Sequence, residues 1–159
     1  MKTAIIYYSY TGNTHHVTQV IDNILKEMGD EVVIVRIRPL KEATNFLIQC
    51  KEAFFDSKPA LYRTLLDLKD FDRIFLGSPV WAFKPAPAVN TYLDNCGSLE
   101  GKTAVCFVTY GSGAGKEKAL EIMEKVLQTK GARVIAKVSF QQGEDAANIK
   151  RKLSGILSK

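Results

Sequence analysis

Hydroxyl and amide side chains gather where the first apolar run of the chain ends. The run covers Thr3–Ser9, and the segment Ser9–Thr14 (SYTGNT) follows it directly before an amphipathic stretch. Amides and the dipole at a helix start attract anions, and serine and threonine hydroxyls donate hydrogen bonds to phosphate oxygens. Gly12 would let the backbone approach a ligand closely. The segment has no lysine or arginine, so we expect amides and hydroxyls alone to hold a phosphate. An ordinary N-cap by Thr11 or Asn13 is the alternative.

Large aromatic side chains mark a second segment, GSPVWAFKPAPAV at residues 77–89. It holds the only tryptophan of the chain, Trp81, with Phe83 two positions later and three prolines close by. Aromatic rings on a backbone stiffened by proline suit stacking against a flat ligand. The alternative is that one of the two rings folds back into the core, and Phe83 is the weaker candidate for ligand contact.

Glycines dominate a third segment, TYGSGAGKEK at residues 109–118. It does not match the two common glycine-rich nucleotide motifs. A P-loop would need a glycine in place of Tyr110 and a hydroxyl residue in place of Glu117, and the dinucleotide fingerprint would need a glycine in place of Lys116. The small residues would instead let the backbone approach a ligand closely. The alternative is a flexible turn that caps the next helix.

Apolar runs of strand length alternate with helical patterns, which predicts a parallel sheet with helices on both faces. The predicted strands are Thr3–Ser9, Glu31–Ile37, Asp72–Ser78, Lys102–Thr109 and Arg133–Phe140. The predicted helices are Asn13–Met28, Ala88–Asn95, Lys116–Thr129 and Glu144–Leu157, with two more over residues 43–61 and 60–71 hinged near Lys58 and Pro59. Right-handed crossovers make this one α/β domain over residues 1–159, a doubly wound three-layer sandwich of five strands in the order 2-1-3-4-5.

In such a sheet, ligands bind beyond the carboxyl ends of the strands, where the strand order reverses. All three segments follow strands at that edge, so we expect them to share one ligand. The first segment suits a phosphate, and the second and third suit a flat apolar ring about one nucleotide away. Flavin mononucleotide (FMN) has this shape.

These motifs resemble those of the flavodoxin-like family, and the resemblance covers essentially the whole chain. The family signature S-x-T-G-N-T is present at Ser9, Tyr10, Thr11, Gly12, Asn13 and Thr14. Residues 77–82 resemble the loop G-[ST]-P-V-[WY], TYGSGAG resembles the third loop of shorter members, and residues 45–61 resemble a helical insertion in one group. The resemblance implies that Ser9–Thr14 bind the phosphate of FMN. It implies ring contacts from Ser78, Pro79, Val80, Trp81, Ala82 and Phe83, and from Thr109, Tyr110, Gly111, Ser112 and Gly113.

Two features depart from the family pattern. Many relatives have a glycine where this chain has Phe83, and in typical flavodoxins a glycine peptide in that loop turns over to bond the reduced flavin. Typical flavodoxins are also strongly acidic, whereas this chain has 22 lysines and arginines against 17 acidic residues, a net charge of +5. The excess of positive charge leaves open an acidic redox partner.

The sequence favours an FMN-binding redox protein that carries electrons between partner proteins. His15 and His16 are the only histidines and no acid–base group is visible, so we predict no catalytic residue. The alternative is an NAD(P)H-dependent FMN or quinone reductase of the same fold, with NAD(P)H and a quinone or flavin acceptor as substrates. Either protein could be a monomer or a homodimer. A phosphoacceptor signalling domain would need acidic residues after the first strand, which this chain lacks, and a cofactor-free interaction module is the remaining alternative.

Composition also bears on binding to nucleic acid, on association with a membrane and on the cellular location. The chain has no basic and aromatic motif of a nucleic-acid module, no signal-peptide layout and no apolar stretch of about 20 residues. We therefore expect no nucleic acid, no membrane and a cytoplasmic location. Cys50, Cys96 and Cys106 are far apart, which supports neither a disulfide framework nor a metal site.

Overall fold

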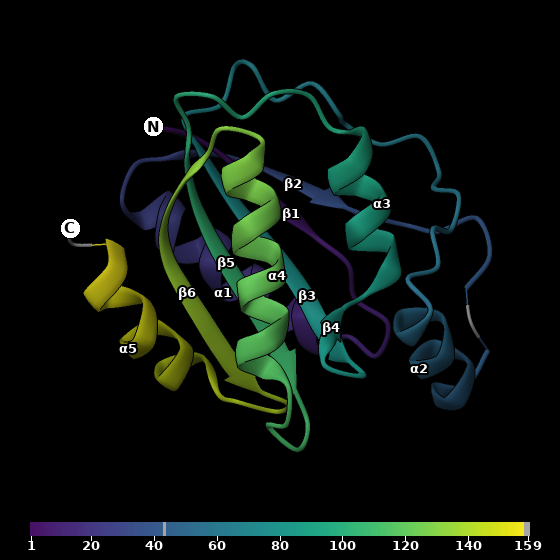
Figure 1. The fold of residues 1–159 in the computed structure, drawn as a ribbon. Coiled ribbons are helices and arrows are strands. Elements are labelled where there is room, and N and C mark those ends of the chain that lie inside the picture. The colour runs from purple at the N-terminus through teal and green to yellow at the C-terminus, as the bar shows by residue number, and fades with distance from the viewer. Residues whose placement is uncertain (43, 158–159) are drawn as a thin grey trace.

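A parallel sheet between layers of helices forms the protein (Figure 1). The computed structural model describes residues 1–42 and 44–157. The long strands are β1 (Lys2–Tyr7), β2 (Glu31–Arg36), β3 (Arg73–Trp81), β5 (Thr103–Tyr110) and β6 (Arg133–Gln141). They pair in parallel in the order β2-β1-β3-β5-β6, so the predicted order is confirmed. A short strand that we did not predict, β4 (Lys84–Pro85), pairs antiparallel with the end of β3.

The helices cover both faces of the sheet. They are α1 (Asn13–Glu27), α2 (Phe46–Phe54), α3 (Pro87–Asn95), α4 (Lys116–Thr129) and α5 (Ala146–Leu157). In Figure 1, α4 lies in front of the sheet and α1 lies behind it. Successive residues of β1 point to opposite faces, so Ala4 and Ile6 join the core under α3 and α4, whereas Ile5 and Tyr7 join the core under α1 and α5. No helix in the described part of the chain is long and apolar enough to span a membrane.

The predicted helix over residues 60–71 is wrong. This stretch has no helix, because its backbone carbonyls accept hydrogen bonds from distant side chains rather than from the amides of a helical turn. Tyr92 Oη donates to the Leu65 carbonyl (2.7 Å), and Lys102 Nζ donates to two further carbonyls of the stretch (2.9 and 2.7 Å). The preceding predicted helix forms only as α2, and Ala43, where we expected it to begin, lies outside the described residues.

Candidate functional site

The loop between β1 and α1 presents backbone amides that donate no hydrogen bond within the described chain. They are the amides of Thr11–Thr14, at the N-terminus of the 15-residue helix α1. Gly12, with a φ of 93°, is the N-cap of this helix, and no side chain caps it. Asn13 Nδ2 donates to the Thr11 hydroxyl instead (2.9 Å), so the N-cap alternative is wrong. Free amides at a helix start make this loop suitable for binding an anion.

Two buried hydroxyls join this loop to the end of β5. Thr14 Oγ1 and Thr109 Oγ1 lie 2.8 Å apart, and both side chains are buried. Thr109 pairs in register with Pro79 of β3. Ser9 is buried as well, and its hydroxyl accepts a hydrogen bond from the His15 amide (3.2 Å). The first and third predicted loops therefore meet through their side chains, and the second begins beside them.

Arg36 brings to this loop a cation that we did not expect. It ends β2, the strand next to β1, and its Nη2 donates to the Ser9 carbonyl (3.3 Å). Burial raises the pKa of the Tyr7 hydroxyl, and the charges of Arg36 and Arg38 oppose that rise. Both guanidinium groups therefore act electrostatically on the end of β1. The loop has a cation beside it, although Ser9–Thr14 contains none.

Of the two histidines, His15 contacts the end of β1. Tyr7 Oη and His15 Nδ1 lie 2.6 Å apart, and the two rings stack with an angle of 22° and centroids 5.7 Å apart. His16 is exposed. No carboxylate in the described part of the chain forms an ion pair with His15, so the pair lacks the third group of an acid–base constellation.

The second loop is a tight hairpin rather than an open loop. Strand β3 continues to Trp81, which pairs with Lys84 of β4 across a two-residue turn. The turn residues Ala82 and Phe83 both have positive φ values, 47° and 67°, which is the pattern of a type I′ turn. Such turns favour asparagine and glycine, and positive φ costs other residues about 1–3 kcal/mol each. Strain of this kind is usually retained at a functional site.

The buried Ser78 hydroxyl stabilises the hairpin by hydrogen bonds to its backbone and to the residue that follows it. Its Oγ accepts a hydrogen bond from the Ala86 amide and donates one to the Pro79 carbonyl, both at 2.8 Å. The side chain is buried, so its first role is to hold β3 and the start of α3 together.

The two aromatic rings of this hairpin have the reverse of the exposures that we expected. Trp81 is 8% exposed and makes edge-on contacts with Tyr8 and Tyr10, with ring centroids 5.5 and 6.3 Å apart. Phe83 is 59% exposed and lies against Gly115, where an added Cβ would come within 2.6 Å of the Phe83 Cα and of a ring carbon. Phe83 therefore presents its ring at this edge, while Trp81 supports Tyr10 from below.

The third loop carries Tyr110 to the same edge. Lys116 Nζ lies 4.6 Å from the centre of the Tyr110 ring, and Gly113, with a φ of 84°, passes beside that ring. Gly111 and Ser112 are exposed. The loop ends at Gly115, the N-cap of α4, and no side chain makes a capping hydrogen bond there. Its central residues therefore remain open to a ligand.

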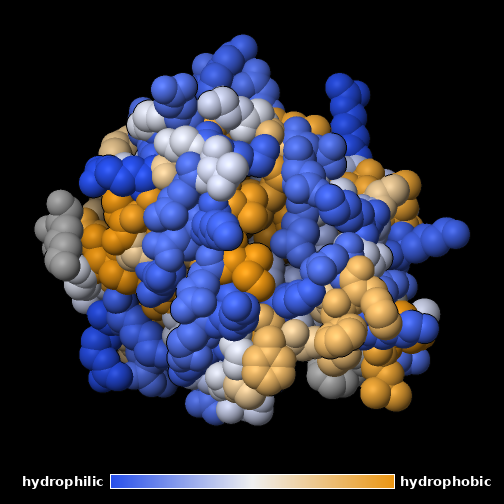
Figure 2. All heavy atoms as spheres, viewed as in Figure 1, coloured by the Kyte–Doolittle hydropathy of each residue, from blue (hydrophilic) through white to orange (hydrophobic). Residues whose placement is uncertain are grey.

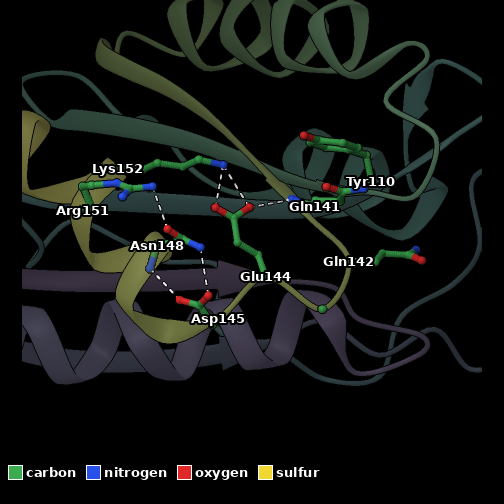
Figure 3. A pocket seen from close by; sticks show the side chains of 9 residues that line it. Tyr110, Gln141, Gln142, Glu144, Asp145, Asn148, Arg151 and Lys152 are labelled. Carbon is green, nitrogen blue, oxygen red and sulfur yellow. Dashed lines mark hydrogen bonds and ion pairs between the residues drawn. The ribbon is translucent and has the colours of Figure 1, made fainter.

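A polar cavity of about 400 Å³ is lined by Tyr110 together with the end of β6 and the start of α5 (Figure 3). Glu144 accepts hydrogen bonds from the Gln141 amide (2.8 Å) and from Lys152 (2.9 Å), and Asp145 accepts one from the Asn148 amide (2.8 Å). These carboxylates satisfy groups of the cavity wall itself. With two carboxylates in its wall, the cavity is less suited to binding an anion than the first loop is.

Comparison with known proteins fits this arrangement. The family model described as flavodoxin matches residues 2–138. The chain belongs to the flavodoxin family. Within the flavodoxin motif, Gly77 has a structural reason, because an added Cβ there would lie 2.1 Å from the Phe107 ring. Arg36 lies outside the motif. The sequence feature that could have indicated its role is its position at the carboxyl end of β2, the strand next to β1.

Solved structures share the flavodoxin fold over nearly their whole length. A candidate flavoprotein from Bacteroides uniformis is 23% identical, with a TM-score of 0.74 over 96% of this chain and 97% of that chain. A flavoprotein from Lactobacillus acidophilus, solved in complex with FMN, is 20% identical, with a TM-score of 0.70 over 99% of each chain. The two-electron reduced flavodoxin of Megasphaera elsdenii is 24% identical, with a TM-score of 0.64 over 99% of each chain. At these identities the likeness shows the fold.

Proposed function

We propose that this member of the flavodoxin family binds FMN and carries electrons between partner proteins. The free amides of Thr11–Thr14 carry the proposal, because they lie where the three loops meet. When bound, FMN supplies reversible electron transfer, and the protein binds, orients and shields it. The Lactobacillus acidophilus relative was solved in complex with FMN, which supports this choice of ligand.

The phosphate of FMN would be held by the amides and hydroxyls of Ser9–Thr14. Gly12 leaves open space beside the backbone, with no atom within 4 Å of an added Cβ, so the residues present fit a phosphate. Arg36 contacts the Ser9 carbonyl, and its positive charge would stabilise a phosphate bound to the same loop.

The flavin ring would be held by residues 78–83 and 109–113. Phe83 and Tyr110 supply aromatic faces at this edge, and such faces suit a flat ring system. Trp81 would act from below, by fixing the position of Tyr10. The two-residue hairpin would orient the ring, because its backbone has little freedom to adopt another turn.

Electron carriage fits the side chains better than turnover of an organic substrate. His15 is hydrogen-bonded to Tyr7 rather than to a carboxylate, and burial raises the pKa of the Cys106 thiol to about 12. The Cys106 thiol therefore offers no thiolate nucleophile near neutral pH, and His15 lacks the carboxylate partner of an acid–base constellation. A cytoplasmic location belongs to the same proposal, since the free thiols of Cys50, Cys96 and Cys106 suit a reducing compartment.

Titration of the apoprotein into FMN tests the proposal. We expect flavin fluorescence to be quenched with a dissociation constant of about 1 μM or lower. Lys118→Ala removes one positive charge from the exposed face of α4 and should bind FMN like the wild type. It is the control for Arg36→Ala, which removes the charge beside the first loop. Unchanged fluorescence at micromolar protein would overturn the proposal. Anaerobic mixing of the FMN-loaded protein with NAD(P)H adds a second test, because rapid bleaching of the flavin would favour the reductase instead.

A further inference from the structure

Exposed apolar side chains are concentrated in the segment between β2 and β3. Eight large apolar residues between positions 40 and 66 are exposed in the described structure. They are Leu40, Leu47, Ile48, Phe54, Phe55, Tyr62, Leu65 and Leu66. The carbonyls of Leu65 and Leu66 accept hydrogen bonds from Tyr92 and Gly97 at the C-terminal end of α3, so we name the surface of the other six residues the insertion face. Figure 2 shows apolar side chains gathered over α2, at the lower right of the molecule. Scattered apolar residues are ordinary on a protein surface, but a concentration of this kind marks an interaction site.

Helix α2 carries large apolar side chains on its outer side as well as an apolar side chain toward the sheet. Ala53 is buried on the side that faces the sheet, whereas Leu47, Phe54 and Phe55 are 79%, 66% and 69% exposed on the surface. The rings of Phe54 and Phe55 contact each other edge to face, with centroids 5.3 Å apart. Apolar side chains on the outer side of a helix, in addition to those that face the core, are expected to be covered by another surface. The insertion therefore adds an apolar surface to the protein rather than a larger core.

The insertion face is continuous with the edge that carries the three loops. Lys84 Nζ donates to the Phe54 carbonyl (3.3 Å) and pairs with Asp56 Oδ1 (2.7 Å), so the C-terminal end of α2 is tied to the hairpin. That hairpin presents the exposed ring of Phe83. In Figure 1, α2 lies beside the hairpin. A protein seated on α2 would therefore reach the edge where we propose that the flavin binds.

Positive charge surrounds the insertion face. The basic side chains from residue 36 to 66 that form no ion pair within the described chain are Arg36, Arg38, Lys41, Lys51 and Arg63. The acidic side chains there without an ion pair are Glu42 and Glu52. A cavity of about 340 Å³ places Arg36 and Arg38 beside Leu40 and Tyr62, so these cations border the apolar residues directly. The complementary surface is acidic around an apolar centre.

We propose that an acidic electron-transfer protein docks on the insertion face, with Phe54 and Phe55 as its central apolar contacts. The proposal rests on the proposed function, because the partner's redox centre would then approach the flavin at the Phe83 edge. In each encounter one electron leaves the reduced centre of the partner and enters the bound flavin. The partner is oxidised by one electron and the flavin is reduced by one. Aromatic anchors surrounded by charge are typical of such interfaces.

Binding of two acidic iron–sulfur proteins, a plant-type ferredoxin and a rubredoxin, tests the proposal. The FMN-loaded chain is immobilised, and affinity is measured by interferometry at low ionic strength. We expect the paired substitution Phe54→Ser and Phe55→Ser to weaken binding of at least one probe by about tenfold. Met28→Ser with Ile135→Ser is the matched control, because these apolar residues are exposed at the C-cap of α1 and on β6, outside the face. The control should bind within about twofold of the wild type.

A charge-reversal pair separates docking on this face from general attraction. Lys51→Glu with Arg63→Glu should weaken binding by about tenfold, whereas Lys118→Glu with Lys125→Glu on α4 changes the net charge equally and should have a smaller effect. Equal losses from the two pairs, or binding that the phenylalanine pair leaves unchanged for both probes, would overturn the proposal. No binding of either probe at about 1 mM would overturn it too.

Two other occupants are outcomes of the same experiments. A dimer seen by sedimentation, and lost with Phe54→Ser and Phe55→Ser, would replace the acidic partner with a second copy of the chain. Binding to phosphatidylserine vesicles that is lost in this same variant would replace it with a membrane surface. FMN quenching is measured on every variant. Loss of docking with wild-type quenching concerns the insertion face, whereas absent quenching in the wild type concerns the proposed function.

Discussion

Replacing Gly115 with alanine tests the contact that holds the β3–β4 hairpin against α4. Gly115 has a φ of 80°, and an added Cβ would come within 2.6 Å of both the Cα and a ring carbon of Phe83. A left-handed φ costs an alanine about 1–2 kcal/mol, and overpacking against fixed atoms adds about 1–3 kcal/mol. We therefore expect Gly115→Ala to lower the free energy of unfolding by about 2–5 kcal/mol. The hairpin should also shift, because the Cα of Phe83 is backbone.

Gly143→Ala is the matched control. Gly143 has a φ of 77° and no atom within 4 Å of an added Cβ, so the substitution should cost only backbone strain, about 1–2 kcal/mol. Urea denaturation of both variants without FMN measures the difference. FMN titration should show binding weakened by about tenfold in Gly115→Ala and unchanged in Gly143→Ala. If the two variants are equally stable, Phe83 does not pack on Gly115 as the structure shows, and the reasoning is refuted.

Three further substitutions test the phosphate loop and the buried charges. Arg36→Ala should raise the dissociation constant of FMN by about tenfold at low salt and flatten its salt dependence, as fluorescence titration at several ionic strengths would show. Lys102→Met should lower the free energy of unfolding by about 2–4 kcal/mol, measured in urea, because one buried and one partly buried carbonyl lose a charged donor. Burial alone would raise the pKa of Asp30, but the hydrogen bond from Thr3 and the charge of Arg73 outweigh it and lower that pKa below its ordinary value. The stabilisation is thus present above the unfolded pKa and lost as pH falls through the folded one, so Asp30→Asn should cost about 3–5 kcal/mol near neutral pH and progressively less in acid.

The strand order could be predicted because buried parallel strands are almost continuously apolar. β1 and β5 consist of such runs, and segments rich in hydroxyl or glycine residues follow them directly. Parallel strands bring their carboxyl ends to one edge, so three separate motifs became one candidate site. The ligand contacts of the individual site residues stay a prediction until FMN binding is measured.

The errors occurred where distant groups decide the local structure. Residues 60–71 carry a helical apolar pattern. Their backbone carbonyls nevertheless accept hydrogen bonds from Tyr92 and Lys102, which belong to other parts of the chain. Arg36 was missed because its contact with Ser9 joins positions 27 residues apart. No short-range pattern contains that contact.

The exposures of Trp81 and Phe83 were reversed for a different reason. They depend on a two-residue turn with positive φ at both positions. The sequence has Ala82 and Phe83 at these positions, and neither is the asparagine or glycine that would indicate such a turn. With a turn this short, β3 extends through Trp81 and carries its ring into the core. Phe83 is left at the tip.

Features that cost stability are concentrated at one edge of this protein. Ala82 and Phe83 hold strained backbone angles, Thr11–Thr14 leave amides without acceptors, and the insertion face beside them exposes apolar rings. The sheet and its other helices follow ordinary rules of burial and pairing. Costs of this kind persist together where binding compensates for them, since each would otherwise be removed by single substitutions. A ligand on the loops would use the amides, and a partner on the insertion face would cover the rings, so one edge would serve both.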